Sequence, residues 1–93
     1  HDALPILYTV IFGRAGCPQC ARVKELAEKV SKSQDNFEWR YVDIHADGVT
    51  RAALEHAAGK PIETVPQIFV DQKHIGSFTE FDKFVRKQFG RVR

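Results

Sequence analysis

The 93-residue chain has only two cysteines, no methionine and no long run of apolar residues. Two cysteines are too few for a secreted domain held together by several disulfides. No apolar stretch approaches the roughly 18 residues of a membrane-spanning helix, so we expect no membrane contact. Because no initiator methionine is present, residues 1–5 are expected to be a leader or a cloning remnant without a function.

An excess of charge of one sign is also absent. The chain carries 14 basic and 12 acidic residues, which leaves a formal net charge of +2. Nucleic-acid-binding domains present a basic face and a recognisable module. Here basic residues cluster only near the end of the chain, at Arg86, Lys87, Arg91 and Arg93. We interpret this cluster as a solvated helix end and expect no nucleic-acid partner. The length predicts one domain, residues 1–93.

The first half of the chain predicts a βαβ unit. Ile6 to Phe12 is a continuous apolar run, which suits a strand buried on both faces of a sheet. From Pro18 onward, apolar residues recur at helical spacing and form one stripe: Val23, Leu26, Ala27 and Val30. The aromatic and β-branched segment 37–44 predicts a second strand. A helix that connects two strands in this way makes them parallel.

The second half predicts a helix, a hairpin and a last helix. We expect Asp47-Gly48 to open the helix and Gly59 with Pro61 to end it. Its apolar face is predicted from Val49, Ala52, Ala53 and Ala57. The strands of the hairpin are predicted at 67–70 and 73–75, joined by a turn at Asp71-Gln72.

For the last helix, Thr79 and Asp82 resemble a capping box. The buried face is predicted from Phe81, Phe84 and Val85. The complete order, β-α-β-α-β-β-α, is that of a single α/β domain.

The two cysteines form the motif Cys17-Pro18-Gln19-Cys20, where the first strand gives way to the first helix. A helix N-terminus favours an anion, because its unpaired backbone N–H groups and its dipole point there. A thiolate is such an anion, and it is the nucleophile of thiol–disulfide exchange. Arg14 and Lys24 add positive charge nearby. We therefore expect Cys17 to be a reactive thiolate.

Cys20 lies one helical turn further along. It is expected to be less exposed than Cys17 and to attack a mixed disulfide formed there. Pro18 and Gln19 are expected to support the active-site geometry and to help tune the reduction potential. A C-x-x-C motif that follows a strand in a βαβ unit favours redox chemistry.

Three other interpretations of the cysteine pair remain open. A structural disulfide would close a tiny loop and hardly restrain the unfolded chain. A structural zinc site needs four ligands, usually from two knuckles. Here there is one knuckle, and the four histidines are scattered: His1, His45, His56 and His74. We therefore expect no metal site. The third interpretation is a pair of inert core thiols.

Four segments together resemble the glutaredoxins, from about Tyr8 to Phe89. The resemblance is especially close to the short bacterial dithiol members, the glutaredoxin 1 type. The segment 12–18 resembles the family's active-site entry, and 41–44 resembles its second strand. The segment 64–70 resembles its cis-proline segment, and 74–80 its last glutathione-contacting turn.

The resemblance implies a thioredoxin-like fold with a four-stranded mixed sheet. It implies an enzyme that uses glutathione to reduce protein disulfides and glutathione mixed disulfides. Cys17 would carry the glutathionyl group, and Cys20 would resolve protein mixed disulfides. Ribonucleotide reductase is a typical family substrate. Glutathione would be the reducing co-substrate, without a permanently bound cofactor. We expect a monomer in the cytoplasm, which is a reducing compartment.

The resemblance also implies a glutathione site. Thr64 and Val65 would hold the cysteinyl backbone, with a cis Val65-Pro66 bond and Pro66 supporting the site. Thr79 and Glu80 would hold the γ-glutamyl end. Each of the polar residues has an alternative role: Thr64 in a turn, Thr79 as a helix cap, Glu80 as a solvated charge.

Two further positions are assigned to the same site by the resemblance. Arg14 would meet the glycine carboxylate of glutathione, or be a solvated charge. Gln19 would lie beside the sulfurs, where the family usually has tyrosine, and could alter glutathione affinity. Ser77 and Glu80 are also departures, because the family usually has glycine and aspartate there.

Two alternative functions follow from these departures and from the motif. A non-aromatic residue between the cysteines also occurs in glutaredoxin-like proteins that are reduced by thioredoxin reductase. A module of another class would bind an iron–sulfur cluster or a metal between two subunits through Cys17 and glutathione. Pro18 and the second cysteine argue against that module. Glutathione sensing without turnover is a third possibility.

Overall fold

The computed structural model describes residues 6–90. The expected leader at 1–5 lies outside the described residues, and so do Arg91 and Arg93 of the predicted basic end.

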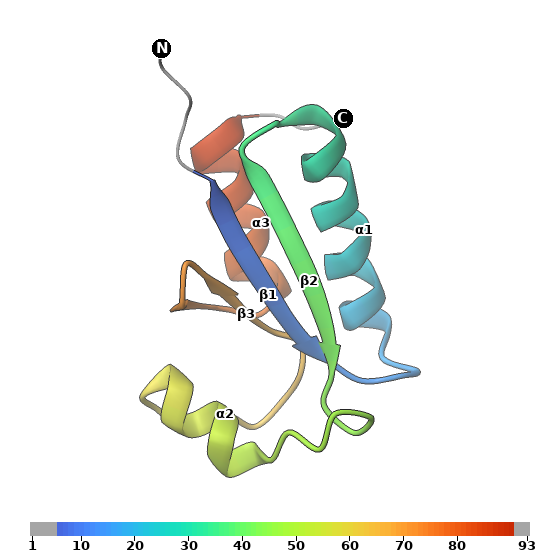
Figure 1. Ribbon diagram of the computed structural model, residues 1–93, viewed down its shortest axis with the longest axis vertical. Coiled ribbons are helices and arrows are strands. Elements are labelled where there is room, and N and C mark those ends of the chain that lie inside the picture. Colours follow the sequence, from blue (N-terminus) through green and yellow to red (C-terminus); the bar gives the residue numbers. More distant parts are fainter. Residues whose placement is uncertain (1–5, 91–93) are drawn as a thin grey trace.

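The chain folds as one sheet with three helices, in the order that the sequence predicts (Figure 1). The elements are β1 (Leu7–Gly13), α1 (Pro18–Ser33), β2 (Phe37–Asp43), α2 (Arg51–Ala58), β3 (Gln67–Val70), β4 (Lys73–Gly76) and α3 (Phe78–Phe89). The strand order across the sheet is β2-β1-β3-β4. β1 is parallel to β2 and antiparallel to β3, and β3 is antiparallel to β4. The predicted four-stranded mixed sheet and thioredoxin-like element order are confirmed.

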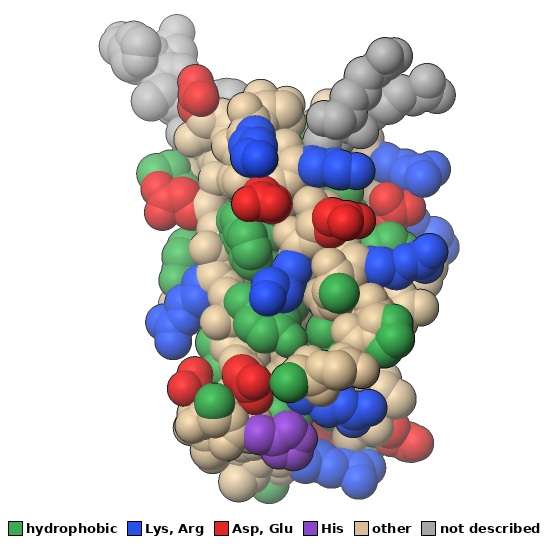
Figure 2. Space-filling view, turned by 90° about the vertical axis from the view of Figure 1, so that its right-hand side faces the viewer, with side chains coloured by type: hydrophobic (Ala, Val, Ile, Leu, Met, Phe, Trp, Pro, Cys, Tyr) green, Lys and Arg blue, Asp and Glu red, His purple; other side chains and the backbone are tan. Residues whose placement is uncertain are grey.

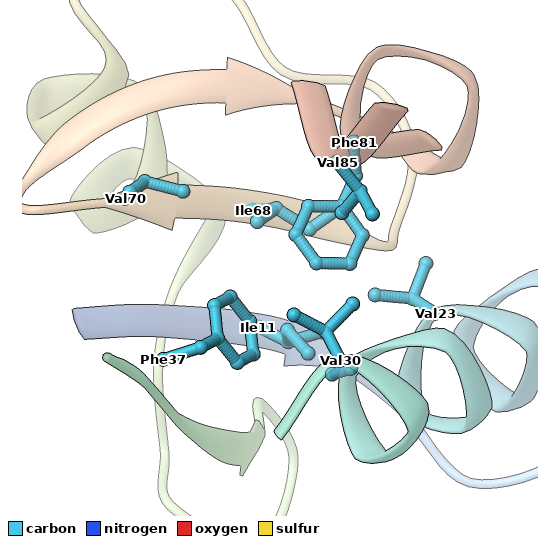
Figure 3. Close-up of a cluster of buried hydrophobic side chains, with 9 residues drawn as sticks. Ile11, Val23, Val30, Phe37, Ile68, Val70, Phe81 and Val85 are labelled. Carbon is cyan, nitrogen blue, oxygen red and sulfur yellow. The ribbon is translucent and has the colours of Figure 1, made fainter. Parts of the chain in front are cut away.

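The main core lies between the sheet and the helices α1 and α3, which run side by side along one face (Figure 1). Ile11 of β1 and Ile68 of β3 are paired in the sheet and point into this core. Figure 3 shows Phe81 and Val85 of α3 reaching toward them from above, opposite Val30 of α1. The apolar stripe predicted for α1 is confirmed, because Val23, Ala27 and Val30 are fully buried.

A second, smaller core lies on the opposite face of the sheet. Because side chains alternate along a strand, Phe12 and Phe69 point away from the main core. They meet edge to face with ring centroids 5.5 Å apart, and Phe69 packs with Leu54 of α2 and with Ile62. α2 thus covers the end of the sheet toward which β1 and β2 run (Figure 1).

This second face is only partly covered, so the expectation that β1 is buried on both faces is wrong. Tyr8 is 41% exposed, and Val10 and Phe12 are half-buried. They line an open hollow of about 510 Å³ together with Phe69 and other residues. The apolar run does not reveal this, because α2 is only eight residues long and lies at one end of the sheet.

The start and the buried face of α2 also differ from the prediction. The helix begins at Arg51, and its N-cap is Thr50, whose hydroxyl accepts the Ala53 N–H at 3.1 Å. Asp47 and Gly48 lie in a preceding turn. The alanines predicted to be buried, Ala52, Ala53 and Ala57, are exposed, and Leu54 is the buried residue. The predicted end is confirmed, since Gly59 is the C-cap in the left-handed conformation.

The cap of α3 lies two residues earlier than predicted. Ser77 is the N-cap, and the carboxylate of Glu80 accepts hydrogen bonds from the Ser77 N–H and hydroxyl, both at 2.9 Å. These bonds lower the pKa of the Glu80 carboxyl below its ordinary value. Thr79 lies inside the first turn, so the predicted Thr79–Asp82 capping box is wrong. The predicted face is confirmed by Phe81 and Val85, while Phe84 is half-buried.

Charges of both signs are mixed on one face of the molecule (Figure 2). Figure 2 shows one face, on which Lys and Arg side chains are interspersed with Asp and Glu. This face therefore carries no continuous surface of one sign. Within residues 6–90, no helix is long and apolar enough to cross a membrane.

The corrected cap of α3 gives a stability prediction. Ser77→Ala should lower the free energy of unfolding by about 0.5–2 kcal/mol, because the capping hydroxyl and its bond to Glu80 are lost while the backbone bond to Glu80 remains. Thr79→Ala is the matched control and should change it by less than about 0.5 kcal/mol. Denaturant unfolding of both variants measures the difference. If Thr79→Ala were the more costly substitution, the cap would be at the position that the sequence first suggested.

Candidate active site

Cys17 lies at the N-terminus of α1, at the end of the loop that follows β1. It is the N-cap residue, with extended backbone angles, and Pro18 occupies the first helical position. The Cys20 backbone N–H donates to the Cys17 Sγ at 3.1 Å. The sulfur thus accepts one of the N–H groups that a helix start leaves without a partner. Cys17 is half-buried, so a reactant can reach its sulfur.

The segment before β3 approaches the same sulfur. The Cys17 Sγ lies 3.8 Å from the Val65 carbonyl oxygen, to which the thiol form donates. The Val65-Pro66 peptide bond is cis, as the resemblance implies, and Pro66 is buried. Two segments 48 positions apart in sequence therefore meet at Cys17.

Cys20 has a different environment. Its side chain is only 1% exposed, which confirms that it is the less accessible thiol. Burial, followed by the neighbouring Cys17 sulfur, raises the pKa of the Cys20 thiol above its ordinary value. The Arg14 backbone and the Tyr41 hydroxyl oppose this rise. Both thiols are free in this structure.

Two hollows flank the cysteines, and Arg14 lines both of them. The first, of about 250 Å³, is bounded by residues 14–17, Cys20, Ala21, Lys24, Tyr41 and Asp43. The structure thus brings Arg14 and Lys24 to the same hollow as the two thiols. The Lys24 ammonium lies 4.5 Å from the centroid of the Tyr41 ring, where a cation–π contact is favourable.

The second hollow, of about 200 Å³, lies between the loop after β1 and the segment before β3. Arg14, Thr64 and Val65 line it, together with His45, Arg51 and residues of the small core. Three of the residues assigned to glutathione by resemblance therefore share one hollow. The lining carries both signs of charge, because Glu63 lies there with the two arginines, and Arg51 is paired with Glu55 at 3.1 Å.

The remaining predicted residues lie apart from these hollows. Thr79 and Glu80 are exposed in the first turn of α3 and line neither hollow. Pro18 and Gln19 are exposed in the first turn of α1 and also line neither. Glu80 uses Oε1 for the Ser77 cap, which leaves Oε2 to accept from another donor.

A hydrogen-bonded chain supports the Thr64–Val65 segment from behind. The Gln67 amide donates to the Thr64 carbonyl at 2.8 Å, and the Gln67 Oε1 lies 2.6 Å from the His74 Nε2. Gln67 is buried at 7% exposure, so these bonds hold its side chain in place. The β3–β4 hairpin is thereby tied to the segment that faces Cys17.

No pattern in the sequence assigns a role in the site to Gln67, His74 or Tyr41. The alternation of Phe37, Trp39 and Tyr41 in β2 was a usable signal for Tyr41. Parallel pairing places Tyr41 opposite Ile11, two residues before the end of β1, and therefore near the cysteines. No comparable signal exists for the Gln67–His74 contact, which depends on the hairpin register.

In the part of the chain that the structure describes, no three His, Cys, Asp or Glu side chains gather as they would around a metal ion. The chemistry available at the site is that of two thiols one helical turn apart. One is accessible and accepts an N–H bond, and the other is enclosed. Such a pair can form a mixed disulfide at the first sulfur and then an internal disulfide.

The chain matches the glutaredoxin family model over residues 9–75. It is 63% identical over 81 residues to glutaredoxin 1 of Salmonella typhimurium, which covers 87% of this chain and 93% of that protein. The NMR structure of reduced Escherichia coli glutaredoxin superposes with a TM-score of 0.84 at 56% identity, covering 90% and 99% of the two chains. A buckwheat glutaredoxin–glutathione complex superposes with a TM-score of 0.67 at 25% identity, covering 90% and 73%.

The support of the Val65 segment by His74 should depend on pH. Burial, followed by the charge of Lys60, lowers the pKa of His74 below 6.5, while Glu80 opposes this. The folded protein therefore binds fewer protons than the unfolded chain just below pH 6.5. The contribution of His74 to the free energy of unfolding should be fully present above that pH, and it should be lost as the pH drops toward the lowered pKa.

The comparison of His74→Gln with wild type isolates this effect. The stability difference between them should shrink as the pH falls from about 7 to 5, because glutamine does not titrate. His56→Gln, on the exposed side of α2, removes an imidazole away from the Thr64–Val65 segment and is the matched control. Chemical denaturation at a series of pH values measures both. A constant difference for His74→Gln would contradict the assignment.

Proposed function

The chain belongs to the glutaredoxin family of thiol–disulfide oxidoreductases, and from this we propose that glutathione is its electron donor. In the proposed reaction it reduces glutathione mixed disulfides and protein disulfides. The observation that carries the proposal is the accessible Cys17 sulfur, which accepts the Cys20 N–H at the start of α1 and lies beside Val65.

For a glutathionylated thiol, the Cys17 thiolate attacks the glutathione sulfur. A Cys17–glutathione disulfide forms, the original disulfide breaks, and the electron pair leaves with the substrate sulfur, which takes up a proton. A second glutathione thiolate then attacks the glutathione sulfur on Cys17. Oxidised glutathione departs and the Cys17 thiolate is restored. Cys20 is not needed for this cycle.

For a protein disulfide, Cys17 forms a mixed disulfide with the protein. Cys20 loses its proton and attacks the Cys17 sulfur, so that the Cys17–Cys20 disulfide forms and the protein thiol leaves. Two glutathione molecules then reduce the enzyme. The enclosed position of Cys20 supports this order, because only Cys17 is accessible to a large substrate. Pro18, at the first helical position, and the buried Pro66 support the geometry.

The proposed glutathione site runs across the second hollow toward α3. The backbone of Thr64 and Val65 would hold the cysteinyl residue beside Cys17, and Arg14 would meet the glycine carboxylate. Thr79 and the Glu80 Oε2 would hold the γ-glutamyl end, and the exposed Gln19 would lie beside the sulfurs. The similarity to the buckwheat glutaredoxin–glutathione complex supports this placement in general terms.

We also propose a protein substrate, a cellular compartment and an oligomeric state. Ribonucleotide reductase is among the proposed protein substrates, and the cytoplasm is the proposed compartment, because glutathione keeps thiols reduced there. A monomer, with residues 1–93 as a single domain, is the proposed form. Glutathione is a co-substrate in this scheme, and no permanently bound cofactor takes part.

Turnover of a small glutathione mixed disulfide tests the proposal. The assay couples the reaction to NADPH through glutathione reductase and compares wild type with Cys17→Ser and Cys20→Ser. We expect wild type and Cys20→Ser to be active and Cys17→Ser to be inactive, because only Cys17 takes part in the monothiol cycle. Reduction of a protein disulfide should require both cysteines.

A parallel assay replaces glutathione and its reductase by thioredoxin reductase. If only that system supports turnover, the glutathione assignments fail and the chain is a glutaredoxin-like protein with another reductant. Absorbance of an iron–sulfur cluster after anaerobic purification, without turnover in either assay, would favour the cluster-binding alternative.

A further inference from the structure

The end of β1 leaves a space that the Tyr41 hydroxyl and the Cys20 sulfur share. Gly13 is the last residue of β1, and it is buried. A Cβ added at Gly13 would lie 2.9 Å from the Cys20 Sγ and would overlap the Tyr41 hydroxyl. Both groups therefore occupy the position beside Gly13 that any other side chain would fill. The absence of a side chain at Gly13 permits their approach.

The Tyr41 side chain is held in this position from several sides. Its hydroxyl donates to the Arg14 carbonyl at 3.3 Å, and its ring packs against the main core. The Lys24 ammonium covers the ring at 4.5 Å. The hydroxyl oxygen is therefore held in place before any reaction begins, and a rotation of its O–H turns the proton from the Arg14 carbonyl toward the Cys20 sulfur.

The surroundings keep Tyr41 a hydrogen-bond donor. Burial, followed by the nearby Cys20 sulfur, raises the pKa of Tyr41 to about 12. Asp43 and Cys17 act in the same direction. Tyr41 therefore keeps its proton at neutral pH, and a phenolic O–H near a sulfur favours the thiolate over the thiol.

We propose that Tyr41 is a positioning residue for Cys20. The Tyr41 hydroxyl stabilises the Cys20 thiolate, which forms before Cys20 attacks a mixed disulfide on Cys17. This inference rests on the proposed dithiol reaction. In that step Cys20 gives its proton to solvent, its sulfur bonds to the Cys17 sulfur, and the bond from Cys17 to the substrate sulfur breaks. The electron pair and then a proton go to the leaving thiol, so the enzyme is oxidised and the substrate reduced.

The need for such a donor follows from the burial of Cys20. A buried thiol resists ionisation, yet only its thiolate attacks. Three kinds of group reach the thiol: the Arg14 backbone, the Cys17 sulfur and the Tyr41 hydroxyl. Lys24 and Asp43 line the same hollow, with opposite charges. The Tyr41 hydroxyl shares the space beside Gly13 with Cys20 and favours the charged form of its thiol, as the Arg14 backbone does, whereas the Cys17 sulfur opposes it.

Tyr41→Phe is the variant that separates the hydroxyl from the ring. Phenylalanine keeps the packing against the core and the face that Lys24 covers, and it removes only the oxygen. Tyr8→Phe is the matched control, because Tyr8 lies near the opposite end of β1 and is 41% exposed. Melting curves of both variants should show that the folded state is retained.

The reaction with the chromogenic disulfide of thionitrobenzoate separates the two steps in one stopped-flow trace. Attack by Cys17 releases the first thionitrobenzoate, and attack by Cys20 on the mixed disulfide releases the second. In Tyr41→Phe we expect the pH midpoint of the second phase to rise. At pH values below that midpoint, the rate of the second phase should fall by about three- to fourfold for each pH unit by which the midpoint rises. The fall is less than tenfold because a more basic thiolate is a better nucleophile, which offsets part of the loss of thiolate.

The effect of Tyr41→Phe on the kinetics should depend on the presence of Cys20. Tyr8→Phe should match wild type in both phases. In a Cys20→Ser background, which has only the first phase, adding Tyr41→Phe should leave the rate of that phase as it is in Cys20→Ser alone. A hydroxyl that served only packing would not move the pH midpoint of one phase.

Two results would overturn the inference, and they are distinguishable. If wild type releases two equivalents and Tyr41→Phe has the same second-phase midpoint, the role of Tyr41 is wrong and the dithiol reaction stands. If wild type releases only one equivalent, Cys20 does not resolve the mixed disulfide, and the proposed dithiol reaction fails together with the inference.

Discussion

The hydrogen bond from the Cys20 backbone to the Cys17 sulfur is the interaction on which the site depends. It forms because α1 begins directly after Cys17, and the helix start leaves backbone N–H groups in need of an acceptor. The place of that start is set by β1, the central strand that pairs with both β2 and β3. The core between the sheet, α1 and α3 then holds the helix in position. The fold thus places the Cys17 sulfur at the N-terminus of α1, just after the end of β1.

The same geometry gives the two thiols unequal environments. Cys17 is at the surface end of the helix, near the Val65 carbonyl, and Cys20 is turned inward beside Gly13 and Tyr41. An accessible first thiol and an enclosed second thiol suit a sequence of two attacks, because a large substrate can meet only the first. The Val65 segment needs its own support, and the chain from Thr64 through Gln67 to His74 supplies it.

Much of this arrangement can be predicted from the sequence, because it depends on local pattern. The apolar stripe that includes Val23, Ala27 and Val30 predicts α1, and the position of Cys17 before Pro18 predicts the helix start. The start of α2 was misplaced because Asp47-Gly48 and Thr50 are both acceptable start signals, and the choice between them depends on where Leu54 meets the small core. For α3 the sequence predicts Thr79 as the cap, and the structure shows why Ser77 is the cap instead: the Glu80 carboxylate accepts from its N–H and hydroxyl.

Contacts between distant segments are predictable only in part, because the alternation in β2 indicates the face on which Tyr41 lies but not the group that it meets. The approach of Tyr41 to Cys20 requires the register of β1 against β2, and also an absent side chain at Gly13. The cis bond at Pro66 was expected from the resemblance, since a proline at a strand start has no such requirement. The site is therefore well predicted where one element defines it, and less well predicted where two elements meet.

The most direct test of the account is the identity of the covalent intermediate on Cys17. Cys20→Ser protein is incubated with oxidised glutathione, digested without reductant and analysed by mass spectrometry. The account predicts one glutathione per chain, attached to Cys17, and no adduct on Cys17→Ser protein treated in the same way. An adduct on Cys20 in the Cys17→Ser protein, or none on Cys17 in the Cys20→Ser protein, would contradict the claim that the chemistry begins at the sulfur held by the start of α1.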